Sequence, residues 1–137
     1  MRTRPVALFV LASAGLLFSG YLSAVKLLSG SCAFNEPCPY FLGYPACWYG
    51  FAMYLVMFLV TAAALAWKEK VKRAVVADAV VSFIGILFAG NFVVQEIARS
   101  AFTGTLGFST CVYGLVFYVA IFIVSFTALR KDSEANK

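Results

Sequence analysis

Four long apolar stretches, separated by short polar segments, dominate the pattern of the chain. A helix needs about 20 apolar residues to cross a hydrocarbon core about 30 Å thick. The pattern therefore predicts membrane-spanning helices near Pro5–Ser29, Ala46–Trp67, Ala74–Ala98 and Thr110–Leu129. A chain of 137 residues is too short to close a membrane barrel from strands. We expect one domain over residues 1–137, an all-α integral membrane four-helix bundle.

The composition agrees with a lipid environment. Hydrophobic residues make up 63% of the chain and charged residues 12%, whereas soluble proteins contain about 25% charged residues. The net charge of +5 does not indicate a nucleic-acid partner, because the basic residues stand in short clusters at the ends of the apolar stretches. The lipid bilayer is the expected partner.

The basic clusters also predict an orientation, since positive residues beside membrane helices favour the cytoplasmic side. They lie before the first stretch, between the second and third, and after the fourth: Arg2, Arg4, Lys68, Lys70, Lys72, Arg73, Arg130 and Lys131. We therefore expect a multi-pass protein of the cell membrane. Both termini would lie in the cytoplasm and the other two loops on the outer face.

The chain repeats itself. Gly15–Gly20 in the first stretch matches Gly85–Gly90 in the third, and Pro45–Tyr54 matches Ser109–Tyr118. We expect two repeated helical hairpins, related by an axis along the membrane normal. The first stretch also has features of a cleavable signal peptide, but its match with the third stretch favours a retained helix.

A stripe of similar residues opens the second and fourth stretches. Spacings of three and seven residues place its members on one helical face, which we expect to point into the bundle. The members are Cys47, Gly50 and Tyr54 in the first repeat and Cys111, Gly114 and Tyr118 in the second. The repeat would bring Cys47 and Cys111 close to its axis.

Four cysteines are the reactive groups of a chain that contains no histidine. Cys32 and Cys38 lie in the first outer loop, and Cys47 and Cys111 open the second and fourth stretches. The predicted topology places all of them on the outer side, where disulfides persist. Among the possible pairings, we favour Cys32–Cys38 and Cys47–Cys111.

Two interpretations of these pairs stay open. Both are inert bonds that hold a small bundle together, or they form a relay in which the loop pair exchanges electrons with the membrane pair through a mixed disulfide. A zinc site is less favoured, because Cys-x5-Cys is not a usual zinc spacing. No metal is therefore predicted.

The chain resembles bacterial homologues of vitamin K epoxide reductase. The resemblance rests on the loop pair Cys32 and Cys38, the segment Gly43–Phe51 followed by Tyr54, and Cys111 at the start of the last stretch. It implies a four-helix bundle around a quinone. The loop cysteines would carry electrons to an active pair that begins at Cys111.

The sequence departs from this family at the active pair. Gly114 stands where the family has its second cysteine. Either Cys47 has taken over as the partner of Cys111, or the redox function is lost and the scaffold remains. The additional cysteine at position 47 favours the first explanation.

Further residues are candidates for the quinone site. Tyrosines and glycines of the stripes would line a ring-shaped ligand, with two polar groups beside it: Gly50, Tyr54, Gly114, Tyr118, Asn91 and Glu96. Lys26 and Glu96 hold matching positions in the repeats, which favours an ion pair near the outer boundary. Asp78, near the cytoplasmic end of the third stretch, is expected to reach the membrane interface.

These observations predict a membrane thiol-disulfide oxidoreductase that passes electrons from substrate thiols through Cys32/Cys38 and Cys47/Cys111 to a quinone. The chain contains no thioredoxin-like domain, so such a partner would be a separate protein. The alternative is a non-enzymatic four-helix membrane protein, or a small subunit of a complex, with structural disulfides.

Overall fold

The computed structural model describes residues 3–30, 40–100 and 110–137. In chain order its elements are α1 (Thr3–Ser29), β1 (Tyr40–Phe41), β2 (Tyr44–Pro45), α2 (Ala46–Ala66), the short 3-10 helix η2 (Lys68–Lys70), α3 (Val71–Ser100) and α4 (Thr110–Ala135). The four predicted spans are confirmed. Both α3 and α4 extend beyond the ends that the apolar pattern predicts.

Each of the four helices is long and apolar enough to cross a membrane. Large apolar side chains cover the outside of the bundle, among them Leu17, Leu87 and Val94 at 75%, 61% and 66% exposure. An apolar surface of this kind is unfavourable in water and suits a lipid environment. The predicted all-α four-helix bundle is thus confirmed, and its helices indicate a multi-pass membrane protein.

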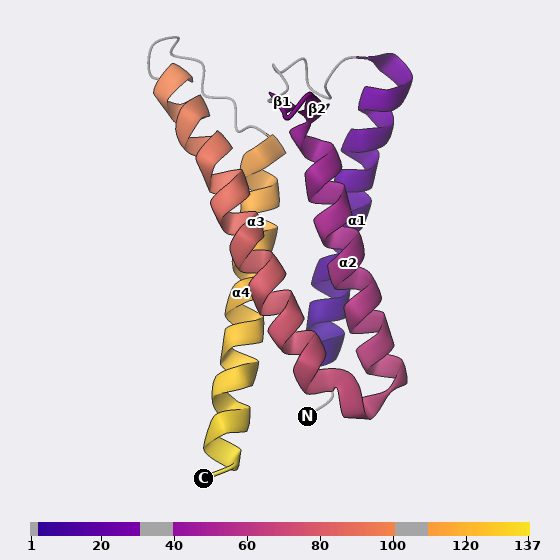
Figure 1. The fold of residues 1–137 in the computed structure, drawn as a ribbon, viewed down its shortest axis with the longest axis vertical. Helices are drawn as coiled ribbons and strands as arrows, with labels where there is room; N and C mark the ends of the chain where they lie inside the picture. Colours follow the sequence, from indigo (N-terminus) through magenta and orange to yellow (C-terminus); the bar gives the residue numbers. More distant parts are fainter. Residues whose placement is uncertain (1–2, 31–39, 101–109) are drawn as a thin grey trace.

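The helices pack as two hairpins. α1 lies along α2 and α3 lies along α4, while α2 also contacts α3 and α1 contacts α4. In this arrangement α2 and α4 face each other across the bundle. Figure 1 shows both termini and the turn between α2 and α3 at one end of the bundle, and β1 and β2 at the other. We call the end with the termini the terminal end, and the end with the two short strands β1 and β2 the hairpin end.

A two-residue turn joins the antiparallel strands β1 and β2. Its residues, Leu42 and Gly43, have φ angles of 52° and 85°. Positive φ at both positions gives the twist that two-residue hairpins need. The Phe41 ring packs against Tyr49 of α2 and Phe88 of α3, with centroids 5.5 Å from each. The strands therefore cover the hairpin end of α2 and α3.

Among the residues that the structure describes, one acidic side chain is buried inside the bundle, in its terminal half. Asp78 is 1% exposed, so the prediction that it reaches the membrane interface is wrong. Asp78 precedes Gly85 by seven residues, close to two helical turns, and therefore shares its helical face. That face meets α4, because the space beside Gly85 is filled by Tyr118.

Candidate functional site

Two tyrosines meet at the centre of the bundle. Tyr54 of α2 and Tyr118 of α4 stack with ring centroids 4.5 Å apart and an interplanar angle of 9°. Tyr54 Oη donates a hydrogen bond to the Gly114 carbonyl oxygen at 2.9 Å, and Tyr118 Oη donates to the Gly50 carbonyl oxygen at 3.5 Å. Both tyrosines are 2% exposed, which confirms that the tyrosines of the two stripes point inward.

Glycines in α1 and α3 make room for these rings. A methyl group at Gly15 would overlap the Tyr54 ring, and a methyl group at Gly85 would overlap the Tyr118 ring. The two hairpins thus form the same contact at matching positions of the repeat. Each ring is held between a glycine of its own hairpin and the tyrosine of the other.

The four stripe residues predicted to line a quinone, Gly50, Tyr54, Gly114 and Tyr118, therefore come together but contact one another. The two rings are in van der Waals contact. A ligand ring between them would have to displace one tyrosine and break its hydrogen bond to a glycine carbonyl. In this structure the four residues join the two hairpins.

Cys47 lies in the first turn of α2, at the hairpin end. Its thiol is free and the residue is half-buried. Seven residues separate it from Tyr54, which places it on the same helical face about 10 Å nearer the hairpin end. Its carbonyl oxygen accepts a hydrogen bond from Ser23 Oγ of α1 at 3.4 Å. Lys26, one turn farther along α1, is near enough to interact with Cys47 electrostatically.

The structure describes the other cysteines only in part. The backbone of Cys111 lies in the first turn of α4, seven residues before Tyr118, at the position that matches Cys47. The Cys111 side chain, and the whole of Cys32 and Cys38, lie outside the described residues. The pairs Cys32–Cys38 and Cys47–Cys111 therefore stay predictions.

Asn91 and Glu96, the polar residues predicted to contact a quinone, lie on different faces of α3. Asn91 is exposed on α3, and its Oδ1 accepts a hydrogen bond from Gln95 Nε2 at 3.2 Å. Glu96 is half-buried and, at eleven residues from Gly85, lies on the inner face of α3 about 16 Å nearer the hairpin end. Lys26 has the same relation to Gly15 on α1. Asn91 and Glu96 thus do not share a face.

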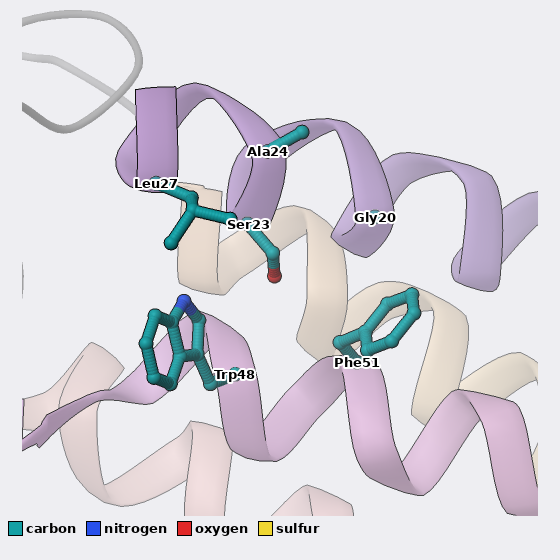
Figure 2. A pocket seen from close by; sticks show the side chains of 6 residues that line it. All are labelled: Gly20, Ser23, Ala24, Leu27, Trp48 and Phe51. Carbon is teal, nitrogen blue, oxygen red and sulfur yellow. The ribbon is translucent and has the colours of Figure 1, made fainter. Parts of the chain in front are cut away.

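An apolar pocket of about 410 Å³ lies between α1 and α2, beside the first turn of α2. Its lining residues are Gly20, Ser23, Ala24, Leu27, Trp48 and Phe51. Figure 2 shows the Ser23 hydroxyl pointing from α1 toward the space between the Trp48 and Phe51 side chains of α2. Aromatic and aliphatic surface with one hydroxyl suits a flat, apolar ligand that carries a hydrogen-bond acceptor.

The sequence pattern does not predict this pocket, although it contains a signal. Trp48 and Phe51 are three residues apart and therefore neighbours on one helical face. Gly20 lies opposite them, because a Cβ there would come within 3.3 Å of Phe51 Cε2. Spacing alone does not show which faces of α1 and α2 meet, so Trp48 is equally compatible with a place in the interfacial aromatic belt.

Comparison of the chain with protein-family models, curated proteins and solved structures gives no match.

Proposed function

We propose that the chain is a membrane thiol-disulfide oxidoreductase that relays electrons from substrate thiols to a quinone. Cys32 and Cys38 form the pair that receives the electrons, and Cys47 and Cys111 form the pair that passes them on. The observation that carries the proposal is the position of Cys47. It is a free, half-buried thiol directly before Trp48, which lines an apolar pocket between two membrane helices.

The repeat supports Cys111 as the partner of Cys47. Each cysteine stands seven residues before one of the stacked tyrosines. Hydrogen bonds from these tyrosines join α2 and α4 at Gly50 and Gly114, one helical turn from each cysteine. A Cys47–Cys111 pair is the arrangement that these bonds favour.

The reaction balances over one cycle. A substrate thiolate attacks the Cys32–Cys38 disulfide, and the second substrate thiolate then releases the oxidised substrate. The reduced loop pair reduces the Cys47–Cys111 disulfide through a mixed disulfide. The resulting dithiol passes its electron pair and its protons to the quinone, so the sum converts a dithiol and a quinone into a disulfide and a quinol.

The pocket residues fit a quinone ring. Trp48 and Phe51 supply aromatic surface, and the Ser23 hydroxyl supplies a donor for a quinone carbonyl. That hydroxyl carries one hydrogen, which is donated to the Cys47 carbonyl oxygen in the structure. Binding of a quinone carbonyl would therefore release the Cys47 backbone and couple the pocket to the first turn of α2.

Lys26 gives Cys47 a positively charged neighbour. The Lys26 ammonium interacts electrostatically with the half-buried Cys47. Lys26 Nζ also donates a hydrogen bond to the Gly30 carbonyl oxygen at 3.1 Å. This bond holds the charge at the hairpin end of α1.

We also propose that the hairpin end faces the outside, where a separate thioredoxin-like protein would exchange electrons with the loop pair. The support is the basic character of the terminal end, which carries Arg4, Lys68, Lys70, Arg73 and Arg130. In sealed right-side-out vesicles, a Lys137→Cys thiol should resist an impermeant maleimide until the membrane is opened. Labelling at position 137 in intact vesicles, identified by mass spectrometry apart from the native cysteines, would contradict this orientation.

Thiol trapping on membranes tests the relay. Alkylation followed by mass spectrometry is expected to find the four cysteines reduced after addition of dithiothreitol and oxidised again after addition of a soluble quinone. Cys47→Ser should abolish quinone reduction and trap a mixed disulfide between Cys111 and a loop cysteine. Ser29→Cys, which adds a thiol at the same end of the bundle, is the control and should leave quinone reduction unchanged. Disulfides that stay oxidised in the presence of dithiothreitol and do not respond to quinone would overturn the proposal.

A second function is favoured by the tyrosine pair. The stack and its two hydrogen bonds join the hairpins as a purely structural protein would require. The chain would then be a non-enzymatic four-helix membrane protein or a small subunit of a complex. In that case the Cys47→Ser variant loses stability without trapping a mixed disulfide.

A further inference from the structure

The terminal half of the bundle contains a carboxyl group without a partner. Asp78 is 1% exposed, and neither of its carboxyl oxygens has a hydrogen-bond partner among the residues that the structure describes. Ser125 on α4 is fully buried, and its hydroxyl is likewise without a partner in the described part of the chain. Two polar groups are thus buried, each able to satisfy the other.

The register of α3 and α4 places these two residues opposite each other. The helices are antiparallel, and Gly85 of α3 meets Tyr118 of α4. Asp78 lies seven residues before Gly85, and Ser125 lies seven residues after Tyr118. Seven residues are close to two turns, so both residues lie about 10 Å from the glycine contact toward the terminal end, on the facing sides of their helices.

Ser82 lies between Asp78 and the Gly85 contact along the axis, one turn beyond Asp78 on the same side of α3. It is fully buried, and its Oγ donates a hydrogen bond to the Ala79 carbonyl oxygen at 3.1 Å. The oxygen lone pairs of Ser82 remain available as acceptors. The site therefore offers one carboxyl group and two hydroxyl groups in an otherwise apolar interior.

The first hairpin shows that the fold does not need an acid at this position. The repeat matches Asp78 with Leu8 and Ser125 with Thr61. Leu8 is 1% exposed and belongs to the apolar core, and Thr61 Oγ1 donates its hydrogen bond to the Met57 carbonyl oxygen of its own helix at 2.7 Å. Packing is thus satisfied by leucine, whereas a buried acid is unfavourable and in a membrane helix usually has a functional role.

We propose that Asp78 and Ser125, with Ser82 beside them, form an intramembrane proton-binding site. Asp78 holds the proton as a neutral carboxylic acid. It makes no hydrogen bond to Ser125 Oγ in this structure, and rotation of the two side chains would let the hydroxyl share the proton. A proton fits this place better than a metal ion, because it needs no shell of additional oxygen ligands, whereas alkali and alkaline-earth ions need several. The inference does not depend on the thiol chemistry proposed above.

The charged groups around the site lie at the surface. They come from every element at the terminal end: Arg4 on α1, Lys68, Glu69 and Lys70 in η2, Lys72 and Arg73 on α3, and Arg130, Lys131, Asp132 and Glu134 on α4. Arg4 Nη1 donates to the Thr127 carbonyl oxygen at 3.2 Å. Arg73 is exposed and only five residues from Asp78, about 8 Å along the axis. The charged surface of the terminal end is therefore the water-exposed region nearest to Asp78 along the axis of α3.

Infrared spectroscopy of the purified full-length protein tests the proposal directly. At neutral pH the wild type should show the C=O stretch of a protonated carboxylic acid, and this band should fall to background in Asp78→Asn. The control is Asp132→Asn, which removes an exposed carboxyl group on α4 and should leave the band intact. Asp78→Leu copies Leu8 of the first hairpin and serves the same purpose should the amide variant not fold.

Ser125→Ala distinguishes a shared proton from an isolated one. Loss of the hydroxyl should shift the same band to the higher frequency of a weakly hydrogen-bonded acid, without removing it. A band that Ser125→Ala leaves unmoved would overturn the pairing of Asp78 with Ser125. Absence of any Asp78-dependent band, or its replacement by a carboxylate band when sodium chloride is added, would overturn the proton site.

Discussion

Tyr54 and Tyr118 each place a hydroxyl on the carbonyl oxygen of the residue four positions before the other. In a helix that oxygen already accepts the N–H of the residue four positions later, so each glycine oxygen receives one bond from each tyrosine. A carbonyl oxygen has two lone pairs and can accept both. The two rings and the two glycines therefore act as one unit at the centre of the bundle.

Loss of the Tyr54 hydroxyl should destabilise the protein more than loss of the Tyr118 hydroxyl. Tyr54→Phe removes a hydrogen bond of 2.9 Å, and Tyr118→Phe removes one of 3.5 Å. We expect a loss of about 1 kcal/mol for Tyr54→Phe and a smaller loss for Tyr118→Phe, measured by thermal unfolding in detergent. Tyr21→Phe, at an exposed position, is the control. Equal stability of all three variants would contradict this account.

Glycine-to-alanine substitutions should lower the stability of the protein at some positions and leave it unchanged or raise it at others. Gly15→Ala and Gly85→Ala force a methyl group into a stacked ring, which we expect to cost about 1–3 kcal/mol. At Gly90 and Gly114 a Cβ meets nothing within 4 Å. Alanine should therefore be neutral or stabilising there, by up to about 1 kcal/mol, through its higher helix propensity. Equal effects at Gly15 and Gly90 in the unfolding assay would argue against the ring contacts.

The turn at the hairpin end should be open to stabilisation. Leu42 has a φ of 52° and is 79% exposed, so it bears the steric cost of the left-handed region without a packing gain. Leu42→Asn should raise stability by about 1 kcal/mol, because asparagine adopts this conformation more readily. Leu42→Ala keeps the Cβ and should show no gain. A melting temperature lowered by Leu42→Asn would contradict the prediction.

Quinone binding should be reported by one of the two tryptophans. Trp48 lines the pocket, whereas Trp67 follows α2 at the terminal end and lies under the Lys70 ammonium at 5.0 Å. A soluble quinone should therefore quench the fluorescence of a Trp67→Phe variant and leave that of a Trp48→Phe variant largely unchanged. Ala24→Phe, which fills the pocket, should weaken the quenching at least tenfold in apparent affinity. Equal quenching of both tryptophans would place the quinone elsewhere.

The sequence predicts the spans and the repeat because apolar length and spacing are properties of the chain alone. The inward direction of Tyr54 and Tyr118 follows from helical spacing as well. Their mutual stack does not, because it depends on the distance and tilt between the two hairpins. The place of Asp78 near the cytoplasmic end of the third stretch predicts a position at the interface, although its seven-residue spacing from Gly85 puts it on the same helical face as that glycine.

The pocket beside Trp48 could not be predicted for a related reason. It exists because Gly20 lets Phe51 approach α1 while small side chains leave space toward Trp48. Such a space depends on the volumes of side chains from two helices at once. By contrast, the predicted spans place Cys47 at the start of the second helix, and the structure has it in the first turn of α2, at the hairpin end.

The reciprocal bonds at the centre have a consequence for how such a bundle is assembled. A single hairpin carries both halves of the interaction, a tyrosine donor and a glycine acceptor four residues apart, and is therefore self-complementary about a two-fold axis. Two copies of one hairpin would form the same centre as the two unlike halves of this chain. The symmetry ends at the level of Leu8 and Asp78, where only the second half carries an acid.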